Sequence, residues 1–314
     1  MRSDAIGLFW QDMPRKKGER AARVMPPIPD TGWQRPTEFP RLGAASALAI
    51  DVETWDPHLV DDGKKKAKGP GWARHDGHLV GIAVGVPDGP RWYFPMRHEV
   101  ESDWNLDPEH VLAWARNELT RPEQPKIGAN IGYDVGWLRE EGVHVKGELH
   151  DVQFAEALLA EASPVNLDHL GMKYLDIPKQ GETLYEWCSN YYGGPVSERQ
   201  RKNIYRAPPR LVGPYAEGDV HLPLHVIGHQ WQRLHEQGLL GVYTMECRLI
   251  YLMIEMRFAG VRVDLDRADQ LRTFLTNEID DIDRQIRNMV GFEVNTSANA
   301  SMAHGPTTLN TMSA

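Results

Sequence analysis

Four carboxylates and one phenol are the side chains of this sequence best suited to chemistry: Asp51, Glu53, Asp134, Tyr215 and Asp219. Carboxylate oxygens are the ligands that hard divalent cations such as Mg²⁺ prefer. A cation held in this way can activate water and stabilise negative charge that develops during a reaction. Chemistry of this kind requires a fold that brings the acids together.

Asp51 and Glu53 follow the almost continuously apolar run that begins at Ala47, which predicts a central strand buried on both faces. Because side chains alternate along a strand, we expect both carboxylates on one face, at the C-terminal end of the strand. With 44 acidic residues in 314, roughly six acidic-x-acidic pairs would arise by chance, so a purely structural pair is the alternative. An unpaired charge beside a buried strand is costly, however, and this favours a function.

The other two acids belong to separate short patterns. Asp134 ends the stretch that starts at Asn130, at a predicted strand-to-helix junction, where an acid is commonly a helix cap. Pro214 is expected at a first helical position, which would place Tyr215 and Asp219 one turn apart on one helix face. Neither pattern is distinctive alone.

The elements that must position these residues follow from the hydrophobic pattern. We expect a hairpin from 78–86 and 91–94, a short strand at 126–129, and helices over 108–119, 133–141, 152–161, 167–174, 183–192 and onward from 215. Strands that alternate with helices and then give way mainly to helices indicate an α/β fold, a mixed sheet with a helical cap.

Composition excludes several classes of protein. The formal net charge of -9 argues against a generic basic coat for nucleic acid, and two cysteines support neither a disulfide framework nor a Cys-rich zinc site. The apolar stretches are too short to span a membrane. We expect an extended, proline-rich arm at 1–43, a catalytic domain at 44–238, a helical segment at 239–294 and a disordered tail at 295–314.

Taken in order, the three acidic patterns resemble the motifs of DEDDy-type 3'-5' proofreading exonucleases, the type with tyrosine in the third motif. The stretches 69–74, 92–99 and 134–138 look like bacteriophage family A DNA polymerases. Residues 248–266 look like the helix and turn that join exonuclease to polymerase in that family, so 239–294 resembles the start of a polymerase domain. The palm and fingers motifs do not appear.

The resemblance implies a ribonuclease H-like mixed sheet with flanking helices and a site for two divalent cations, Mg²⁺ or Mn²⁺. Asp51 would bridge both ions, and Glu53 and Asp219 would complete the site that activates water. Asp134 would hold the second ion mostly through water, and the Tyr215 hydroxyl would orient the attacking water.

Substrate grip is expected from basic and aromatic residues around the acids. Asn130 would position the substrate strand or the Asp134 loop, with a turn-capping role as the alternative. The other candidates share a positive charge or an aromatic ring: Lys64, Lys65, Arg199, Arg201, Lys202, Arg206 and Tyr205. Solvated charges and packed aromatic rings are the ordinary alternatives.

The sequence therefore predicts a metal-dependent 3'-5' exonuclease that hydrolyses DNA from the 3' end to 5'-mononucleotides, as the proofreading half of a split phage polymerase. Its partners would be single-stranded DNA 3' ends and a separately encoded polymerase subunit, in the cytoplasm of the phage's host and with no membrane. An exoribonuclease that trims RNA ends is the alternative enzyme, because these motifs do not read the 2'-hydroxyl. A non-catalytic subunit that binds primer ends or a polymerase is the alternative outside enzymes.

Overall fold

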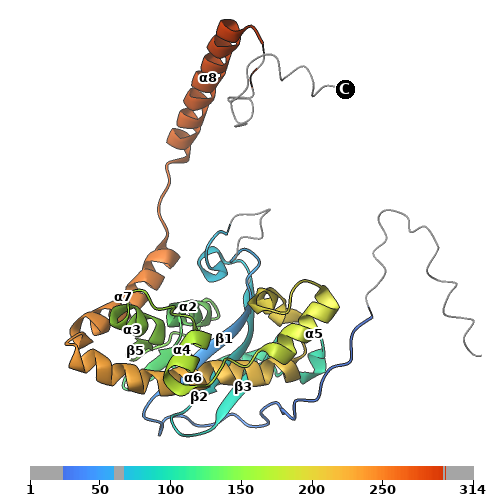
Figure 1. Cartoon of the computed structure of the whole chain (residues 1–314), viewed down its shortest axis with the longest axis vertical. Coiled ribbons are helices and arrows are strands. Elements are labelled where there is room, and N and C mark those ends of the chain that lie inside the picture. Colours follow the sequence, from blue (N-terminus) through green and yellow to red (C-terminus); the bar gives the residue numbers. More distant parts are fainter. Residues whose placement is uncertain (1–23, 60–66, 293, 295–314) are drawn as a thin grey trace, which may run out of the picture. The chain divides into compact units, whose positions relative to one another are not determined.

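The computed structural model describes residues 24–59, 67–292 and 294 (Figure 1). Contacts divide the chain into a unit at 1–258 and a second at 259–314, and each is considered by itself. The first part of the expected arm, Lys64, Lys65 and the expected tail at 295–314 lie outside the described residues.

A five-stranded mixed sheet, in the order β3-β2-β1-β4-β5, forms the centre of the first unit. The strands are β1 (Leu48–Trp55), β2 (His78–Gly85), β3 (Arg91–Pro95), β4 (Lys126–Gly128) and β5 (Leu149–Asp151). β2 is antiparallel to β1 and β3, whereas β4 and β5 continue the sheet in parallel. The predicted central strand and hairpin are confirmed, and the arrangement is the expected ribonuclease H-like mixed sheet with flanking helices.

The helices of the described residues match most of the predicted ones in place. They are α1 (Pro108–Glu118), α2 (Ile131–Glu140), α3 (Val152–Leu159), α4 (Leu167–Leu175), α5 (Glu182–Tyr192), α6 (Pro209–Glu236), α7 (Leu240–Ala259) and α8 (Leu265–Val290), with short 3-10 helices at Gly71–Arg74, Ser102–Trp104 and Glu198–Arg206. The three-residue strand β5 was not predicted from the sequence.

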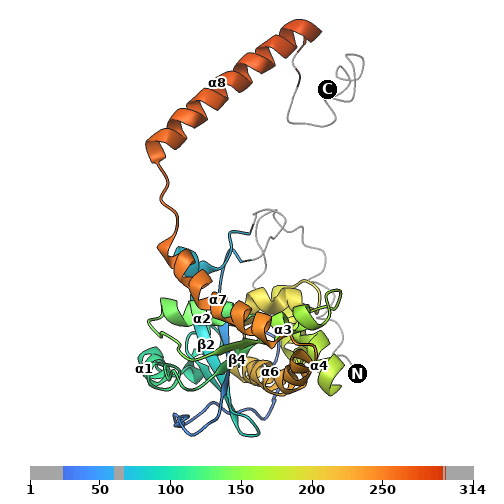
Figure 2. The ribbon, with the colours of Figure 1, turned by 90° about the vertical axis from the view of Figure 1, so that its left-hand side faces the viewer.

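The two faces of the sheet bury different kinds of side chain. On one face the large residues Leu48, Ile50 and Val52 pack with α1 and α2. On the other face, Ala49 pairs with Gly85 and belongs to the same buried cluster as residues of α5 and α6. α6 lies next to β4 (Figure 2). A side chain at Gly85 would lie 3.2 Å from both Val220 and Leu224 of α6, so small residues let this helix approach the sheet closely.

The start of α6 differs from the prediction. The helix begins at Pro209, and Pro214 lies inside it rather than at its first position. An interior proline cannot donate to the carbonyl four residues earlier. That carbonyl, of Arg210, instead accepts a hydrogen bond from the Thr31 hydroxyl at 2.7 Å. The described part of the arm thus supplies a donor for the carbonyl that Pro214 leaves unpaired.

A second contact fastens the arm to α6. The Trp33 indole N–H donates to Glu217 Oε1 at 2.7 Å, and the Trp33 ring lies against Gly213, where a side chain would clash. The arm has neither helix nor strand over its described residues up to Leu42, as its prolines predict. It therefore braces the helix that carries Tyr215 and Asp219.

The second unit consists, in its described part, of α8 and the residues beside it. Asp264 caps α8 by accepting from the Arg267 backbone N–H at 2.9 Å. Leu271, Leu275 and Ile279 recur along one face of the helix and are about half exposed within the unit. Across the described ranges, no helix combines the length and the apolar character needed to cross a membrane.

Candidate active site

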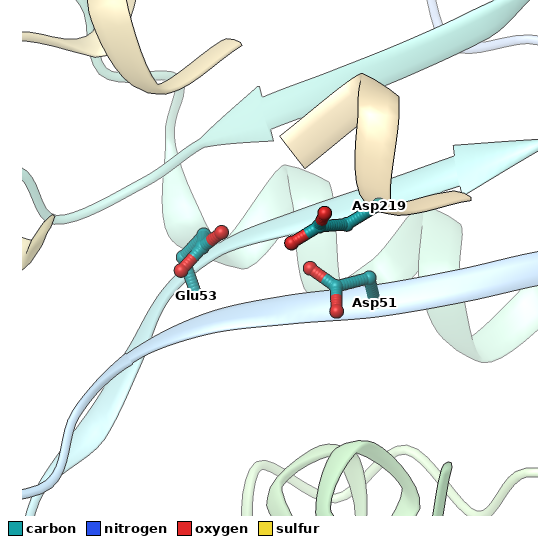
Figure 3. A group of neighbouring side chains, drawn as sticks. All are labelled: Asp51, Glu53 and Asp219. Carbon is teal, nitrogen blue, oxygen red and sulfur yellow. The ribbon is translucent and has the colours of Figure 1, made fainter. Parts of the chain in front are cut away.

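Three of the four predicted acids converge. Asp51, Glu53 and Asp219 each offer a carboxylate oxygen, and these oxygens lie within 4.8 Å of one another. The carboxylates of Asp51 and Asp219 point toward each other, and Glu53 lies further along the strand of Asp51 (Figure 3). The first two acids share a face of β1, as predicted, but Asp51 is at the middle of the strand rather than at its end. Asp219 reaches them from α6.

Burial raises the pKa of each of these three acids. Burial and then the charge of Asp219 raise the pKa of Asp51 from 3.8 to about 8. Burial, followed by Asp51 and Asp219, raises the pKa of Glu53. Glu53 and Asp219 are buried and Asp51 is partly buried, and three carboxylates this close cannot all be charged without a compensating cation.

The acids fit a divalent cation by their chemistry. All three present oxygen, the donor that Mg²⁺ and Mn²⁺ prefer. Asp219 is only 7% exposed. Its Oδ1 atom is buried and has no hydrogen-bond partner among the described residues. A buried acceptor of this kind is costly unless something occupies it. The side chains therefore suit a bound ion.

Asp134 is near these acids but not among them. Its Oδ1 accepts a hydrogen bond from the backbone N–H of Val52, the residue between Asp51 and Glu53, at 3.1 Å. Burial and then the charge of Asp51 raise its pKa. β4 pairs with β1 only at Leu48 and Ala49, so Val52 lies beyond this ladder and Asp134 supplies the missing acceptor. This backbone role was not predicted from the sequence.

Asn130 precedes α2 in a left-handed conformation, with φ of 60°, and its side chain forms no capping hydrogen bond to the helix. It is exposed. The structure thus gives no support to the turn-capping alternative through its side chain, and leaves the amide free to face a substrate.

Lys179 is a site residue that the sequence did not reveal. Its Nζ lies 2.6 Å from Asp219 Oδ2 and 4.4 Å from the centre of the Tyr215 ring. Burial raises the pKa of Asp219, while Lys179 and then Arg201 oppose that rise. Lys179 stands in the loop between α4 and α5, where a lone lysine carries no motif, so only the folded chain identifies it.

Tyr215 is 4% exposed and lies beside the acids. Burial and then the charge of Asp219 raise its pKa well above 10, so the phenol keeps its proton and can donate a hydrogen bond. The Tyr185 hydroxyl donates to the Tyr215 hydroxyl at 3.4 Å, and Arg201 hydrogen-bonds to Tyr185. A chain of polar groups therefore leads from Arg201 toward the acids.

Arg199, Lys202, Tyr205 and Arg206, also predicted to contact substrate, lie on the 3-10 helix Glu198–Arg206, which contacts β1. The guanidinium of Arg206 lies over the ring of Tyr192 at 3.9 Å and near that of Tyr205 at 5.5 Å. Tyr205 in turn lies 6.0 Å from Trp55, at the end of the strand that carries the acids. Arg199 and Lys202 are exposed. Trp55 was not predicted as a contact, because an aromatic residue that ends a strand is ordinarily core.

Comparison with known proteins places the chain in a family. The model of a family described as 3'-5' exonuclease matches residues 73–235, which include Asp134, Tyr215 and Asp219 but not Asp51 or Glu53. A DNA-directed DNA polymerase of Pseudomonas phage M6 is 30% identical over 86% of this chain and 40% of that relative. A DNA polymerase DpoZ of Salmonella phage PMBT28 is 31% identical over 84% of this chain and 39% of that relative.

A solved structure shares the fold. The POL domain of Pol1 from M. smegmatis, in complex with DNA primer-template and dNTP, aligns with a TM-score of 0.57 and 17% identity, over 82% of this chain and 36% of that one. The chain spans about 40% of the length of the two phage relatives. By the family match over half its length, the chain belongs to the 3'-5' exonuclease family of family A DNA polymerases.

Proposed function

We propose that this chain hydrolyses single-stranded DNA from its 3' end, with two divalent cations, and releases 5'-mononucleotides. The observation that carries the proposal is the group of Asp51, Glu53 and Asp219, with a buried Asp219 oxygen that lacks a partner in the described structure. In a chain of the exonuclease family, such a group is best explained as the ligand set of the catalytic ions.

Each side chain has a role in this proposal. Asp51, Glu53 and Asp219 would hold the ions, and Asp134 would contribute through water while it holds the backbone of Val52. Bound divalent ions supply a Lewis acid for the phosphodiester and lower the pKa of a bound water. The protonated Tyr215 hydroxyl would orient the attacking water, since a hydroxyl can donate one hydrogen bond and accept others.

The substrate strand would lie along the cationic and aromatic residues described above. Arg201 is close enough for its charge to act on all three acids, so it would contact a phosphate of a strand bound at these acids. Tyr205 and Trp55 would stack bases, a contact that tolerates any sequence. The exposed Asn130, Arg199 and Lys202 and the half-buried Arg206 would add polar or phosphate contacts.

Labelled strands test the reaction directly. With Mg²⁺, a 5'-labelled DNA strand should shorten one nucleotide at a time, and excess chelator should stop the reaction. The nucleotide products should carry a 5'-phosphate. An RNA strand of the same sequence should be cut more slowly; faster cutting of RNA would identify an exoribonuclease instead. Cleavage of circular single-stranded DNA at a comparable rate would contradict attack at an end, and failure to cut any strand would contradict the enzyme.

We also propose that the chain acts together with a polymerase, as the names of its phage relatives suggest. One face of α7 presents mainly apolar side chains, including Leu249 and Leu252. Leu252 is 53% exposed and Met256 is 62% exposed. Exposed apolar patches of this kind mark interaction surfaces, and a polymerase body is the partner that this proposal places there.

Two negative charges introduced on α7 test whether this helix binds a polymerase. The double substitution L249E/L252E should abolish co-purification with the polymerase of the same replication system, because two carboxylates would be desolvated in the contact. Hydrolysis of short strands should stay within about twofold of the wild type, since surface changes away from the site have small effects. Met172→Glu, at another exposed apolar residue of a helix, is the matched control. Undiminished co-purification of the double variant would rule out α7 as the surface.

A further inference from the structure

Lys179 occupies a position that exonuclease chemistry does not by itself require. Its side chain is 10% exposed, and its ammonium forms an ion pair with Asp219 Oδ2 at 2.6 Å. The charge of Lys179 also acts on Asp51 and Glu53. One lysine therefore neutralises part of a group of three acids.

The loop of Lys179 is anchored on both sides of the residue. The Lys179 backbone N–H donates to Asp168 Oδ1 at 2.9 Å, and the Ile177 backbone N–H donates to the Gly171 carbonyl at 3.2 Å. After the loop, a side chain at Gly181 would lie 2.8 Å from the Tyr185 ring, so the chain passes close to α5. The backbone thus holds Lys179 at the acids.

We propose that Lys179 competes with the metal ion: its ammonium holds Asp219 in the ion-free protein and must leave Asp219 Oδ2 before a divalent cation binds. This inference rests on the proposed function, because it takes the three acids to be ion ligands. An ammonium and a divalent cation at one carboxylate repel each other, so the Lys179–Asp219 pair opposes binding of the ion. With the lysine in place, Asp219 Oδ2 is taken by the ion pair, and Asp219 Oδ1 has no hydrogen-bond partner in the described structure.

The competition has a consequence for ion affinity. Binding of the ion includes the cost of breaking the Lys179–Asp219 pair, so the affinity measured in solution is lower than the acids alone would give. In return, the ion pair limits repulsion among the acids when no ion is present. Lys179 is thus a residue that sets the ion concentration at which the site fills.

Titration with MnCl₂ at fixed pH and ionic strength tests this directly by calorimetry. Lys179→Met keeps the length of the side chain and removes its charge, and should lower the Kd for Mn²⁺ by about tenfold or more. Lys173→Met is the matched control, because Lys173 forms a comparable ion pair with the buried Glu156 at 2.5 Å. That variant should leave the Kd unchanged. Lys179→Arg, which retains the charge, should bind Mn²⁺ much more weakly than Lys179→Met.

A second measurement uses the wild-type chain, so its result does not depend on whether a variant folds. Chemical acylation of lysines, followed by mass spectrometry, should label Lys179 faster when Mn²⁺ is added, and Lys173 at the same rate. An unchanged or higher Kd in Lys179→Met, or no gain in Lys179 labelling, would overturn the inference. Failure of the wild type to bind Mn²⁺ at all would instead contradict the proposed function, so the two failures are distinguishable.

Discussion

Replacing Asp51 with Asn should reduce hydrolysis of single-stranded DNA by at least about 10³-fold, which corresponds to roughly 4 kcal/mol of lost transition-state stabilisation. Asparagine has nearly the shape of aspartate but cannot offer a charged ligand to an ion. Binding of the strand should largely persist, since the proposed phosphate and base contacts lie on other residues. Single-turnover hydrolysis and strand binding, measured in parallel on the same preparation, would separate the two effects.

The same substitution should stabilise the ion-free protein. The pKa of Asp51 is raised to about 8, so its charged form is disfavoured in the fold, and a neutral side chain removes that cost. We expect a higher Tm without ions, and a much smaller rise in Tm on addition of Mn²⁺ than the wild type shows. Asp88→Asn, at an exposed turn residue, is the control and should change neither quantity. Retention of more than a few per cent of activity by the Asp51 variant would exclude Asp51 as an ion ligand.

The parts of the site that the sequence predicts are those that depend on local geometry. The two-residue spacing of Asp51 and Glu53 places them on one face of any strand, and the four-residue spacing of Tyr215 and Asp219 places them on one face of any helix. This second relation held although α6 begins at Pro209, because the helical spacing does not depend on where the helix starts.

What the sequence could not supply depends on contacts between distant segments. Lys179 meets Asp219 across 40 positions of sequence, and Thr31 compensates for Pro214 from the far end of the unit. Trp55 and Tyr205 come together only because the 3-10 helix at Glu198–Arg206 lies against the end of β1. Hydrophobic periodicity does not predict such tertiary contacts, and a single lysine or threonine forms no recognisable sequence motif.

The family resemblance and the structure indicate different roles for the Asp134 carboxylate. The motif implies an ion held through water, whereas the observed contact is a hydrogen bond from Val52 that fixes the backbone between Asp51 and Glu53. The two roles are compatible, since a carboxylate has two oxygens and Oδ1 alone accepts from Val52. Substitutions can separate the two roles, because the charge of Asp134 and its hydrogen bond from Val52 can be removed independently.

Asp134→Asn and Asp134→Ala should therefore separate charge from backbone support. Asparagine keeps a carbonyl oxygen for the Val52 N–H, so its Tm should stay near that of the wild type, whereas alanine leaves a buried donor unpaired and should cost about 1–3 kcal/mol in the free energy of unfolding. If the charge serves the second ion, both variants should lose about 10²-fold or more in hydrolysis under single-turnover conditions. A fully active Asn variant beside an inactive, destabilised Ala variant would show that Asp134 acts only on the backbone, and that the ions rely on Asp51, Glu53 and Asp219 alone.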